Sequence, residues 1–447
     1  MQDAILYWNK VAIEATRVDF STPDPSVSPT PEQPGTTLVS RALAIVHLAM
    51  YDAYMGLRGG ATYLTYSAAE KPAPGDLKTA QAAVASAATL TLISFYRRQR
   101  EALRQAQVDF LVSLGAADSE IARGIAWGEI VASKMLEDRA RDGSEGSEEF
   151  YAPSPEPLRH RPDPQNPTQG FGGPLWGKVR PFGISRLTEV VPGSKPPSPS
   201  SAVYLEAFNE VKARGARESR VRTPEQTLIG QFWSCAGVRN IGLPVRLFNQ
   251  VVRAIALQKG ANEAQNVRLF AVVNVALADA EIQVRYEKYR YNYWRPVVGI
   301  REVSPGYGPT GRGDGNPETE SDGGWLPLGD PRTNQPSLSA FTPNSPSYPS
   351  GHATLGTAAL HAARLELGLD PSFVFEASSD ELNGTSLDEN GSQRVRHVRQ
   401  LTIDGAIDEN LSSRVYLGVH WRYDGDEGKA NGLLIARKIH DAFPARA

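Results

Sequence analysis

Two cationic side chains stand seven residues apart in the segment Lys288-Tyr-Arg-Tyr-Asn-Tyr-Trp-Arg295-Pro296. On a helix, seven residues make about two turns, so Lys288 and Arg295 would share one face. Two cations on one face attract an anion, and Pro296 would end or kink the helix directly after them. A solvated basic face also explains this segment taken alone, because Arg285 and Arg290 are close by.

A second segment, Pro349-Ser350-Gly351-His352, is followed by a run of small residues. The proline-led turn predicts a helix N-terminus, whose free N–H groups and positive dipole end attract phosphate-like anions. Ser350 adds a hydroxyl, Gly351 lets a ligand approach the backbone, and His352 stands where it could donate a proton. An ordinary capped helix with an incidental histidine explains this segment equally well.

The third segment contains Arg414, His420 and Asp424, with spacings of six and four residues. At helical spacing, Asp424 can accept a hydrogen bond from one ring nitrogen of His420, which leaves the other nitrogen as a ligand or nucleophile. A core histidine satisfied by an acid would explain His420 and Asp424, but it would not explain Arg414.

Together the three segments resemble the signature of the superfamily that joins vanadium-dependent haloperoxidases with type 2 phosphatidic acid phosphatases and bacterial acid phosphatases. That signature reads Lys, six residues, Arg-Pro; then Pro-Ser-Gly-His; then Ser-Arg, five residues, His, three residues, Asp. Every fixed position is met in order, within the C-terminal third of the chain. The resemblance implies a pocket for one vanadate or phosphate per chain, built from Lys288, Arg295, Ser350, Gly351, His352, Arg414 and His420.

The same residues fit two reactions. In a haloperoxidase, the resemblance implies that His420 binds vanadium, with Asp424 behind it. His352 then acts as acid–base when hydrogen peroxide binds, and a halide leaves as hypohalous acid. In a soluble acid phosphatase, His420 would attack phosphorus to form a phosphohistidine, and His352 would protonate the leaving group. A silent helical binding protein that keeps the pocket is a third class, and the retention of both histidines argues against it.

Features outside the motif favour the haloperoxidase. The chain of 447 residues is longer than the soluble acid phosphatases of this superfamily. The stretch from Arg161 to Phe182 resembles bacterial and algal haloperoxidases. Ser345 stands where chloride-oxidising members resemble one another in carrying Phe and algal bromide enzymes carry His, and Arg285 stands where chloride enzymes tend to carry Trp. Both departures favour iodide or bromide over chloride, so Arg285 and Ser345 are candidate halide-site residues.

Helical periodicity dominates the elements that must position these residues. We expect an all-α fold of two helical bundles side by side, residues 1–220 and 221–447, with the active site in the second bundle and long loops at 144–199 and 304–349. Thr223, Pro224 and Gln226 form a capping box at one helix start. The expected helices cover residues 4–15, 38–55, 77–96, 101–114, 119–139, 202–213, 243–257, 263–291, 352–367, 402–417 and 424–442.

Composition bounds the function further. The net charge of −3 argues against broad nucleic-acid binding, and no apolar stretch is long enough to span a membrane. A single cysteine, Cys235, allows no internal disulfide. A secreted or periplasmic protein whose signal peptide has been removed fits the N-terminus, so the compartment stays open. Whether the chain is a monomer or a homodimer also stays open.

The remaining histidines match no position of the signature. We expect His47 to be a core histidine, because it lies in an apolar helical run, and His160 and His397 to lie at the surface in arginine-rich loops. An approach of His160 to the pocket is the alternative, because its loop resembles that of the family. Asp279, on the helix that leads to Lys288, is either a helix-surface acid or a buried partner of a motif residue.

Overall fold

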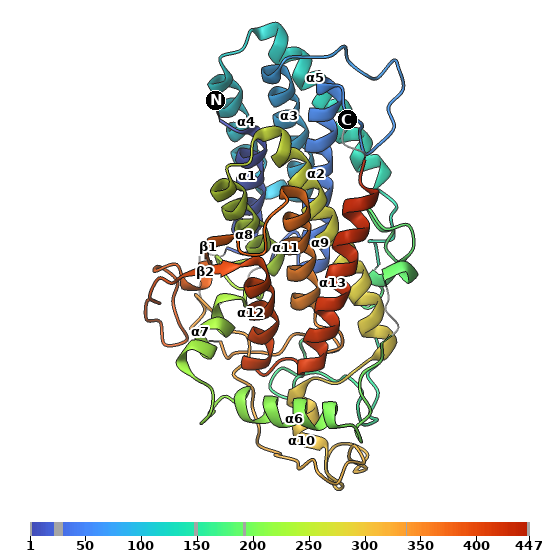
Figure 1. Ribbon diagram of the computed structural model, residues 1–447, viewed down its shortest axis with the longest axis vertical. Coiled ribbons are helices and arrows are strands. Elements are labelled where there is room, and N and C mark those ends of the chain that lie inside the picture. The colour runs from blue at the N-terminus through green and yellow to red at the C-terminus, as the bar shows by residue number, and fades with distance from the viewer. Residues whose placement is uncertain (1, 22–29, 147–150, 191–193, 337, 445–447) are drawn as a thin grey trace.

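The computed structural model describes residues 2–21, 30–146, 151–190, 194–336 and 338–444. These residues form thirteen α-helices and one small sheet (Figure 1). The helices are α1 (Ala4–Asp19), α2 (Gly35–Arg58), α3 (Leu77–Phe95), α4 (Arg100–Leu114), α5 (Asp118–Asp138), α6 (Ala202–Arg214), α7 (Pro224–Phe232), α8 (Pro244–Lys259), α9 (Glu263–Tyr291), α10 (Pro296–Glu302), α11 (Gly351–Leu367), α12 (Ile403–Tyr416) and α13 (Arg422–Ala442). Strands β1 (Val374–Ser378) and β2 (Val398–Thr402) pair antiparallel, with Val374 opposite Thr402.

Helix α9 forms the centre of the molecule. Almost every residue from Asn266 to Val284 is buried, because apolar residues recur on all faces of this stretch, and a helix of that kind lies in a core. It packs against α2 on one side and against α11 and α13 on another. Figure 1 shows these four helices running along the long axis, with α3 to α5 at one end and α6 and α10 at the other.

Two glycines on α13 allow this helix to lie directly against the start of α11. A Cβ atom on Gly432 would stand 2.6 Å from the carbonyl oxygen of Thr354, and one on Gly428 would stand 2.8 Å from that of Ser350. Larger residues would push the helices apart. The close packing places the first turn of α11 beside the first turn of α13, where the Ser350 amide donates to the Asp424 carbonyl over 2.8 Å.

A smaller aromatic core lies among α6, α10 and the start of α13. The indole nitrogen of Trp421 donates to the carbonyl of Trp294 over 3.0 Å, and Tyr204 packs near the Trp421 ring. Trp294 precedes Arg295 and Trp421 follows His420. This core therefore holds two segments of the signature in fixed relation.

The prediction of an all-α fold is confirmed, since the described chain is helical apart from two strands of five residues. The sequence did not predict these strands, because their short alternation resembles that of a loop. The boundary between residues 220 and 221 stays a prediction, and the main hydrophobic core includes residues from α1 through α13. No described helix has the length and apolarity needed to cross a membrane.

Candidate active site

The oxyanion pocket begins at the N-terminus of α11. Ser350 is the N-cap, in an extended conformation with φ −73° and ψ 119°, and its hydroxyl accepts from the Ala353 amide. Around Gly351, a Cβ atom would meet only the Lys288 side chain, at 3.9 Å. The backbone of this first turn is therefore open toward Lys288. A helix N-terminus in that position attracts an anion.

Lys288 and Arg295 do not share a helix, contrary to the sequence expectation. Helix α9 ends at Tyr291 because Asn292 adopts the left-handed conformation, with φ 52°, and Pro296 opens α10 as its first residue. Arg295 is thus the N-cap residue of α10. The two side chains nevertheless line the same cavity, because the chain turns between the helices and brings Arg295 back toward Lys288.

Both cations are almost fully buried without an acidic partner among the described residues. The Lys288 ammonium donates to the carbonyls of Pro346 and Ser347 over 2.6 and 3.0 Å. Arg295 donates from Nε to the Ser345 carbonyl over 2.7 Å. Burial lowers the pKa of Arg295 to about 9, and burial together with Arg295 holds the pKa of Lys288 well below its usual value. An anion between them would reverse both shifts.

Arg414 supplies a third cation from α12, and it is fully buried. Its Nη2 atom donates to both carboxylate oxygens of Asp330, over 3.0 and 2.9 Å. Its Nε and Nη1 atoms are buried with no hydrogen-bond partner among the described residues. Buried donors of this kind are costly unless a ligand satisfies them.

Asp330 orients Arg414, and no motif or spacing in the sequence indicates this role. Its carboxylate also accepts from the Ser234 hydroxyl over 2.7 Å. Burial alone would raise the pKa of Asp330, but Arg414 and His352 lower it below its usual value. Asp330 lies in the long irregular segment before α11, where no helical spacing relates it to a motif residue.

His420 lies between Asp424 and Arg295. Its Nδ1 atom is 2.9 Å from the Asp424 carboxylate, and its Nε2 atom is 2.8 Å from Nη1 of Arg295. Because a carboxylate accepts and a guanidinium donates, the proton belongs on Nδ1, and Nε2 keeps its lone pair. Burial and the neighbouring cations Arg295 and Lys288 hold the pKa of His420 well below its usual value. A neutral imidazole is the form that binds a metal, and a metal here would take the Nε2 lone pair to which Arg295 donates.

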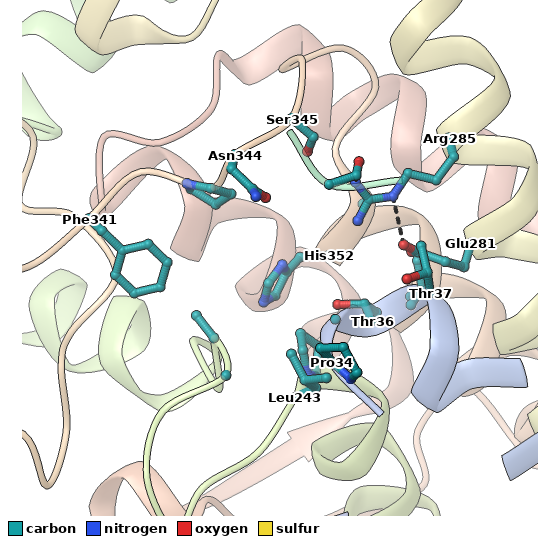
Figure 2. A pocket seen from close by; sticks show the side chains of 18 of the residues that line it. Pro34, Thr36, Thr37, Leu243, Glu281, Arg285, Phe341, Asn344, Ser345 and His352 are labelled. Atoms are coloured by element: carbon teal, nitrogen blue, oxygen red, sulfur yellow. Dashed lines mark hydrogen bonds and ion pairs between the residues drawn. The ribbon is translucent and has the colours of Figure 1, made fainter. Parts of the chain in front are cut away.

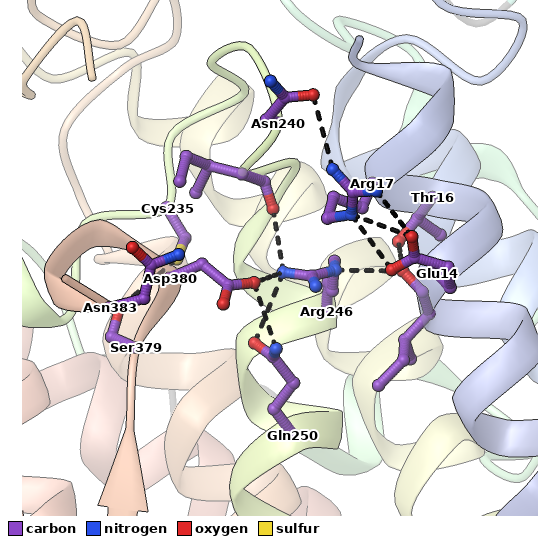
Figure 3. Close-up of polar contacts among 12 residues, drawn as sticks. Glu14, Thr16, Arg17, Cys235, Asn240, Arg246, Gln250, Ser379, Asp380 and Asn383 are labelled. Carbon is purple, nitrogen blue, oxygen red and sulfur yellow. Dashed lines mark hydrogen bonds and ion pairs between the residues drawn. The ribbon is translucent and has the colours of Figure 1, made fainter. Parts of the chain in front are cut away.

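His352 faces the cavity from the first turn of α11 (Figure 2). Its Nε2 atom lies 2.7 Å from the Ser234 carbonyl, so Nε2 carries the proton and Nδ1 is left as an acceptor. Burial and Arg414 lower the pKa of His352. The ring is therefore neutral at neutral pH, and its Nδ1 atom carries the lone pair.

The cavity that joins these groups has a volume of about 480 Å³. Lys288, Arg295, Gly351, His352 and His420 line it, together with both halide-site candidates, Arg285 and Ser345. Ser350, Arg414 and Asp424 are not among the lining residues. They are fully buried, as the helix cap, the partner of Asp330 and the partner of His420.

Arg285 is held in place at one side of the cavity. Its Nε atom donates to Glu281 over 2.8 Å and its Nη1 atom donates to the Gly172 carbonyl over 2.6 Å. Figure 2 shows this pair next to Thr37, with Ser345 above. Glu281 stands one helical turn before Arg285 on α9, a spacing that the sequence analysis did not use.

His160 is fully buried, so the expectation of a surface position is wrong. Its arginine neighbours reach outward, as Arg161 does to Glu302, while the His160 ring packs edge-on against Phe171 at 5.6 Å between centroids. Asp279 is buried as well. Its carboxylate accepts from three backbone amides and not from a motif residue, namely those of Phe182, Gly183 and Ile184.

The pocket fits a tetrahedral oxyanion such as vanadate. It offers two unsatisfied nitrogens of Arg414, an open helix N-terminus, two buried cations without acidic partners, and the Nε2 lone pair of His420. Backbone and guanidinium donors suit the oxygens of the anion, and a neutral imidazole suits a metal centre. These features define a helical protein that holds one tetrahedral oxyanion.

Comparisons with known proteins agree with this class. The profile of the VCPO second helical-bundle domain matches residues 268–445, and that of the vanadium chloroperoxidase N-terminal domain matches residues 2–170. Vanadium chloroperoxidase of Curvularia inaequalis is 30% identical over 98% of this chain and 81% of its own length. The chain belongs to the vanadium haloperoxidase family. It is an enzyme that acts on hydrogen peroxide, and vanadate is its cofactor.

Solved structures share the fold. The crystal structure of a bacterial vanadium-dependent iodoperoxidase superimposes with a TM-score of 0.73 at 22% identity, covering 98% of this chain and 95% of that one. The holo-type bacterial vanadium-dependent chloroperoxidase gives a TM-score of 0.64 at 15% identity, covering 95% of this chain and 94% of that one.

Proposed function

We propose that this haloperoxidase oxidises iodide or bromide, and not chloride, with hydrogen peroxide to give hypohalous acid. The observation that carries the halide choice is Ser345, a small polar residue that lines the cavity next to Arg295. A serine leaves more room for a large halide than an aromatic ring does. Arg285 supports the proposal, because the pair that it forms with Glu281 makes this side of the cavity polar.

The site residues divide the work as follows. Lys288, Arg295 and Arg414 would neutralise the oxyanion, the Ser350 cap and the Gly351 backbone would complete its cradle, and His420 would hold the metal through Nε2. Bound vanadate supplies a Lewis-acidic centre that polarises hydrogen peroxide.

His352 acts as the acid–base residue in proton transfer. Its Nδ1 atom accepts a proton from the incoming peroxide and returns it to the oxygen that leaves with the halogen. Asp424 keeps the His420 proton on Nδ1, which leaves the lone pair of Nε2 for the metal. The iodoperoxidase among the solved structures agrees with the halide choice, and the chloroperoxidase relative does not oppose it.

Initial rates of vanadate-loaded protein with equal concentrations of chloride, bromide or iodide test the proposal. We expect the order iodide, bromide, chloride, with chloride at the background rate. A Ser345→Phe variant fills space at the cavity wall, so it should slow iodide more than bromide. Chloride oxidation as fast as bromide oxidation in the wild type would overturn the halide choice. Hydrolysis of p-nitrophenyl phosphate by vanadate-free protein, without any halide oxidation after loading, would instead favour a phosphatase.

A further inference from the structure

The cavity is larger than vanadate, peroxide and a halide require. A volume of about 480 Å³ lies within the range of pockets that bind organic molecules. Apolar side chains cover part of its wall, namely Phe20, Leu243, Phe341 and Leu355. Small hydrophilic substrates do not need such a wall, because they gain little from apolar surface.

The cavity has two different sides. In Figure 2, Arg285 and Glu281 lie on one side of His352, Phe341 lies on the other, and Ser345 lies above. The first side is polar and suits a halide. The second side is aromatic, and His352 stands between the two.

Arg332 adds a cation to the aromatic side. Its guanidinium carbon lies 3.8 Å from the centroid of the Phe341 ring, and both residues line the cavity. Its Nε atom donates to the Ser339 carbonyl over 3.3 Å, while its two terminal nitrogens have no acceptor among the described residues. No described acid forms an ion pair with Arg332, which distinguishes it from Arg285 with its Glu281 partner.

The Arg332–Phe341 pair is tied to the oxyanion pocket. Phe341 and Asp330 exchange two backbone hydrogen bonds, of 2.8 and 3.2 Å, and Asp330 in turn holds Arg414. A molecule that bound to Arg332 and Phe341 would therefore stand at a fixed place relative to the site where hypohalous acid forms. The stacked guanidinium is also preorganised, so less freedom is lost when it binds a planar anion.

We propose that Arg332 and Phe341 form a docking site for an electron-rich aromatic acceptor that carries a carboxylate, such as a hydroxybenzoate. This inference rests on the proposed function, which supplies the hypohalous acid. The carboxylate binds the terminal nitrogens of Arg332, and the acceptor ring packs along the apolar wall. In the halogenation step, the O–halogen bond of hypohalous acid breaks and a ring carbon bonds the halogen. The ring loses a proton, which leaves with the hydroxide as water.

Calorimetric titration of vanadate-loaded protein with 4-hydroxybenzoate tests binding directly, without peroxide or halide. Loading fills the oxyanion pocket, so the carboxylate has no access to it. We expect saturable binding that Arg332→Ala weakens about tenfold or more, because a charge-assisted bidentate contact is lost. Arg332→Lys should recover only part of the affinity, since an ammonium neither stacks on an aromatic ring nor binds a carboxylate through two nitrogens. Arg104→Ala removes an exposed arginine of α4 and serves as the matched control.

A competition experiment tests whether docking directs the chemistry. Loaded enzyme receives peroxide, iodide and equal amounts of 4-hydroxybenzoate and its neutral amide, and the product ratio is compared with that from free hypoiodous acid. The wild type should favour the carboxylate several-fold over the free reagent, and Arg332→Ala should return to the reagent ratio. Circular dichroism verifies that each variant is folded.

The two proposals fail in different ways. No saturable binding in the wild type, or equal affinity in the wild type and Arg332→Ala, would overturn the docking site. A loaded enzyme that halogenates neither acceptor would overturn the proposed function, while the titration would still decide whether the acceptor binds.

Discussion

Two buried polar clusters, each built around a histidine, show opposite designs. In the first, His47 of α2 is 2.7 Å from the Leu43 carbonyl through Nδ1 and 2.9 Å from the Asn9 amide nitrogen through Nε2. Asn9 continues to Asn249 and Asn274 over 2.9 Å contacts. Both ring nitrogens have neutral partners, and the one cation that the contacts of Asn9 bring in, Arg253, donates to the Asn9 carbonyl oxygen over 3.3 Å. Neither ring nitrogen of His47 is left for a ligand.

The second cluster surrounds His420 and remains open toward the cavity. It collects three cations, of which only Arg414 has an acidic partner among the described residues, and two nitrogens of Arg414 lack any partner there. Burial lowers the pKa of His47 to about 4, and burial also lowers that of His420. A shifted histidine pKa therefore does not distinguish function from packing. Unsatisfied buried donors and uncompensated buried charge do distinguish a functional cluster from a structural one.

The largest expected effect is on the open cluster. His420→Ala removes the only side chain that offers the metal a nitrogen lone pair held by Asp424, so vanadate-dependent iodide oxidation should fall to the detection limit. The assay is the initial rate with saturating vanadate. His397→Ala, in a partly exposed loop, is the matched histidine control and should keep the wild-type rate. A His420→Ala protein with appreciable activity would mean that another residue binds the metal.

The next effect concerns the acid that orients Arg414. Asp330→Asn keeps the shape of the side chain but removes its charge, so the bidentate contact weakens and Arg414 loses its orientation. We expect vanadate affinity to fall about 10- to 100-fold, as for other residues that orient a metal site from behind. Calorimetric titration with vanadate measures this.

The matched control for Asp330→Asn is Asp404→Asn. It breaks the ion pair with Arg364, in which Asp404 is largely exposed to solvent. Affinity unchanged in both variants would show that Asp330 does not set the position of Arg414.

The sequence predicted the residues of the cluster around His420 better than it predicted the residues that orient them. The resemblance to the family signature predicted Lys288, His420 and Asp424, and helical spacing accounts for the contact between His420 and Asp424. Asp330 and Ser234 reach the site from loops that are distant in sequence, and Ser234 contributes both a hydroxyl to Asp330 and a carbonyl to His352. Only tertiary packing creates those contacts, so no local sequence pattern predicts them.

Two errors have local physical causes. The expected helix 263–291 ends where α9 ends, but Lys288 and Arg295 do not share a helix face. Asn292 tolerates the left-handed conformation and Pro296 lacks the amide that would continue the helix. The predicted surface position of His160 fails because its backbone amide bonds the Asn292 carbonyl over 3.0 Å, which draws the residue inward while its arginine neighbours extend away. In both places a few backbone contacts outweigh the average preference of the sequence.

A pH experiment tests whether the His47 cluster is purely structural. The pKa of His47 is about 4 in the folded protein and 6.5 in the unfolded chain, so between these values the unfolded chain binds more protons. The free energy of unfolding should therefore fall as the pH drops from 6.5 toward 4, by on the order of 3 kcal/mol. His47→Gln cannot take up this proton. The urea concentration at its unfolding midpoint should therefore fall less between pH 6.5 and pH 4 than that of the wild type. Its iodide oxidation at neutral pH should equal that of the wild type, and a loss of activity would connect the closed cluster to catalysis.

The smallest effect is expected for the Ser345 hydroxyl. It lies 3.4 Å from Nη2 of Arg295, whereas the Ser345 carbonyl holds Nε at 2.7 Å and is unchanged by Ser345→Ala. A hydrogen bond of that length contributes little, so the KM for iodide should change by about two- to threefold. Ser113→Ala, which removes a hydroxyl bonded within α4, is the control and should leave the KM unchanged. A change beyond about tenfold would mean that the hydroxyl contacts the halide itself, because the loss of one long contact to Arg295 is too weak to account for it.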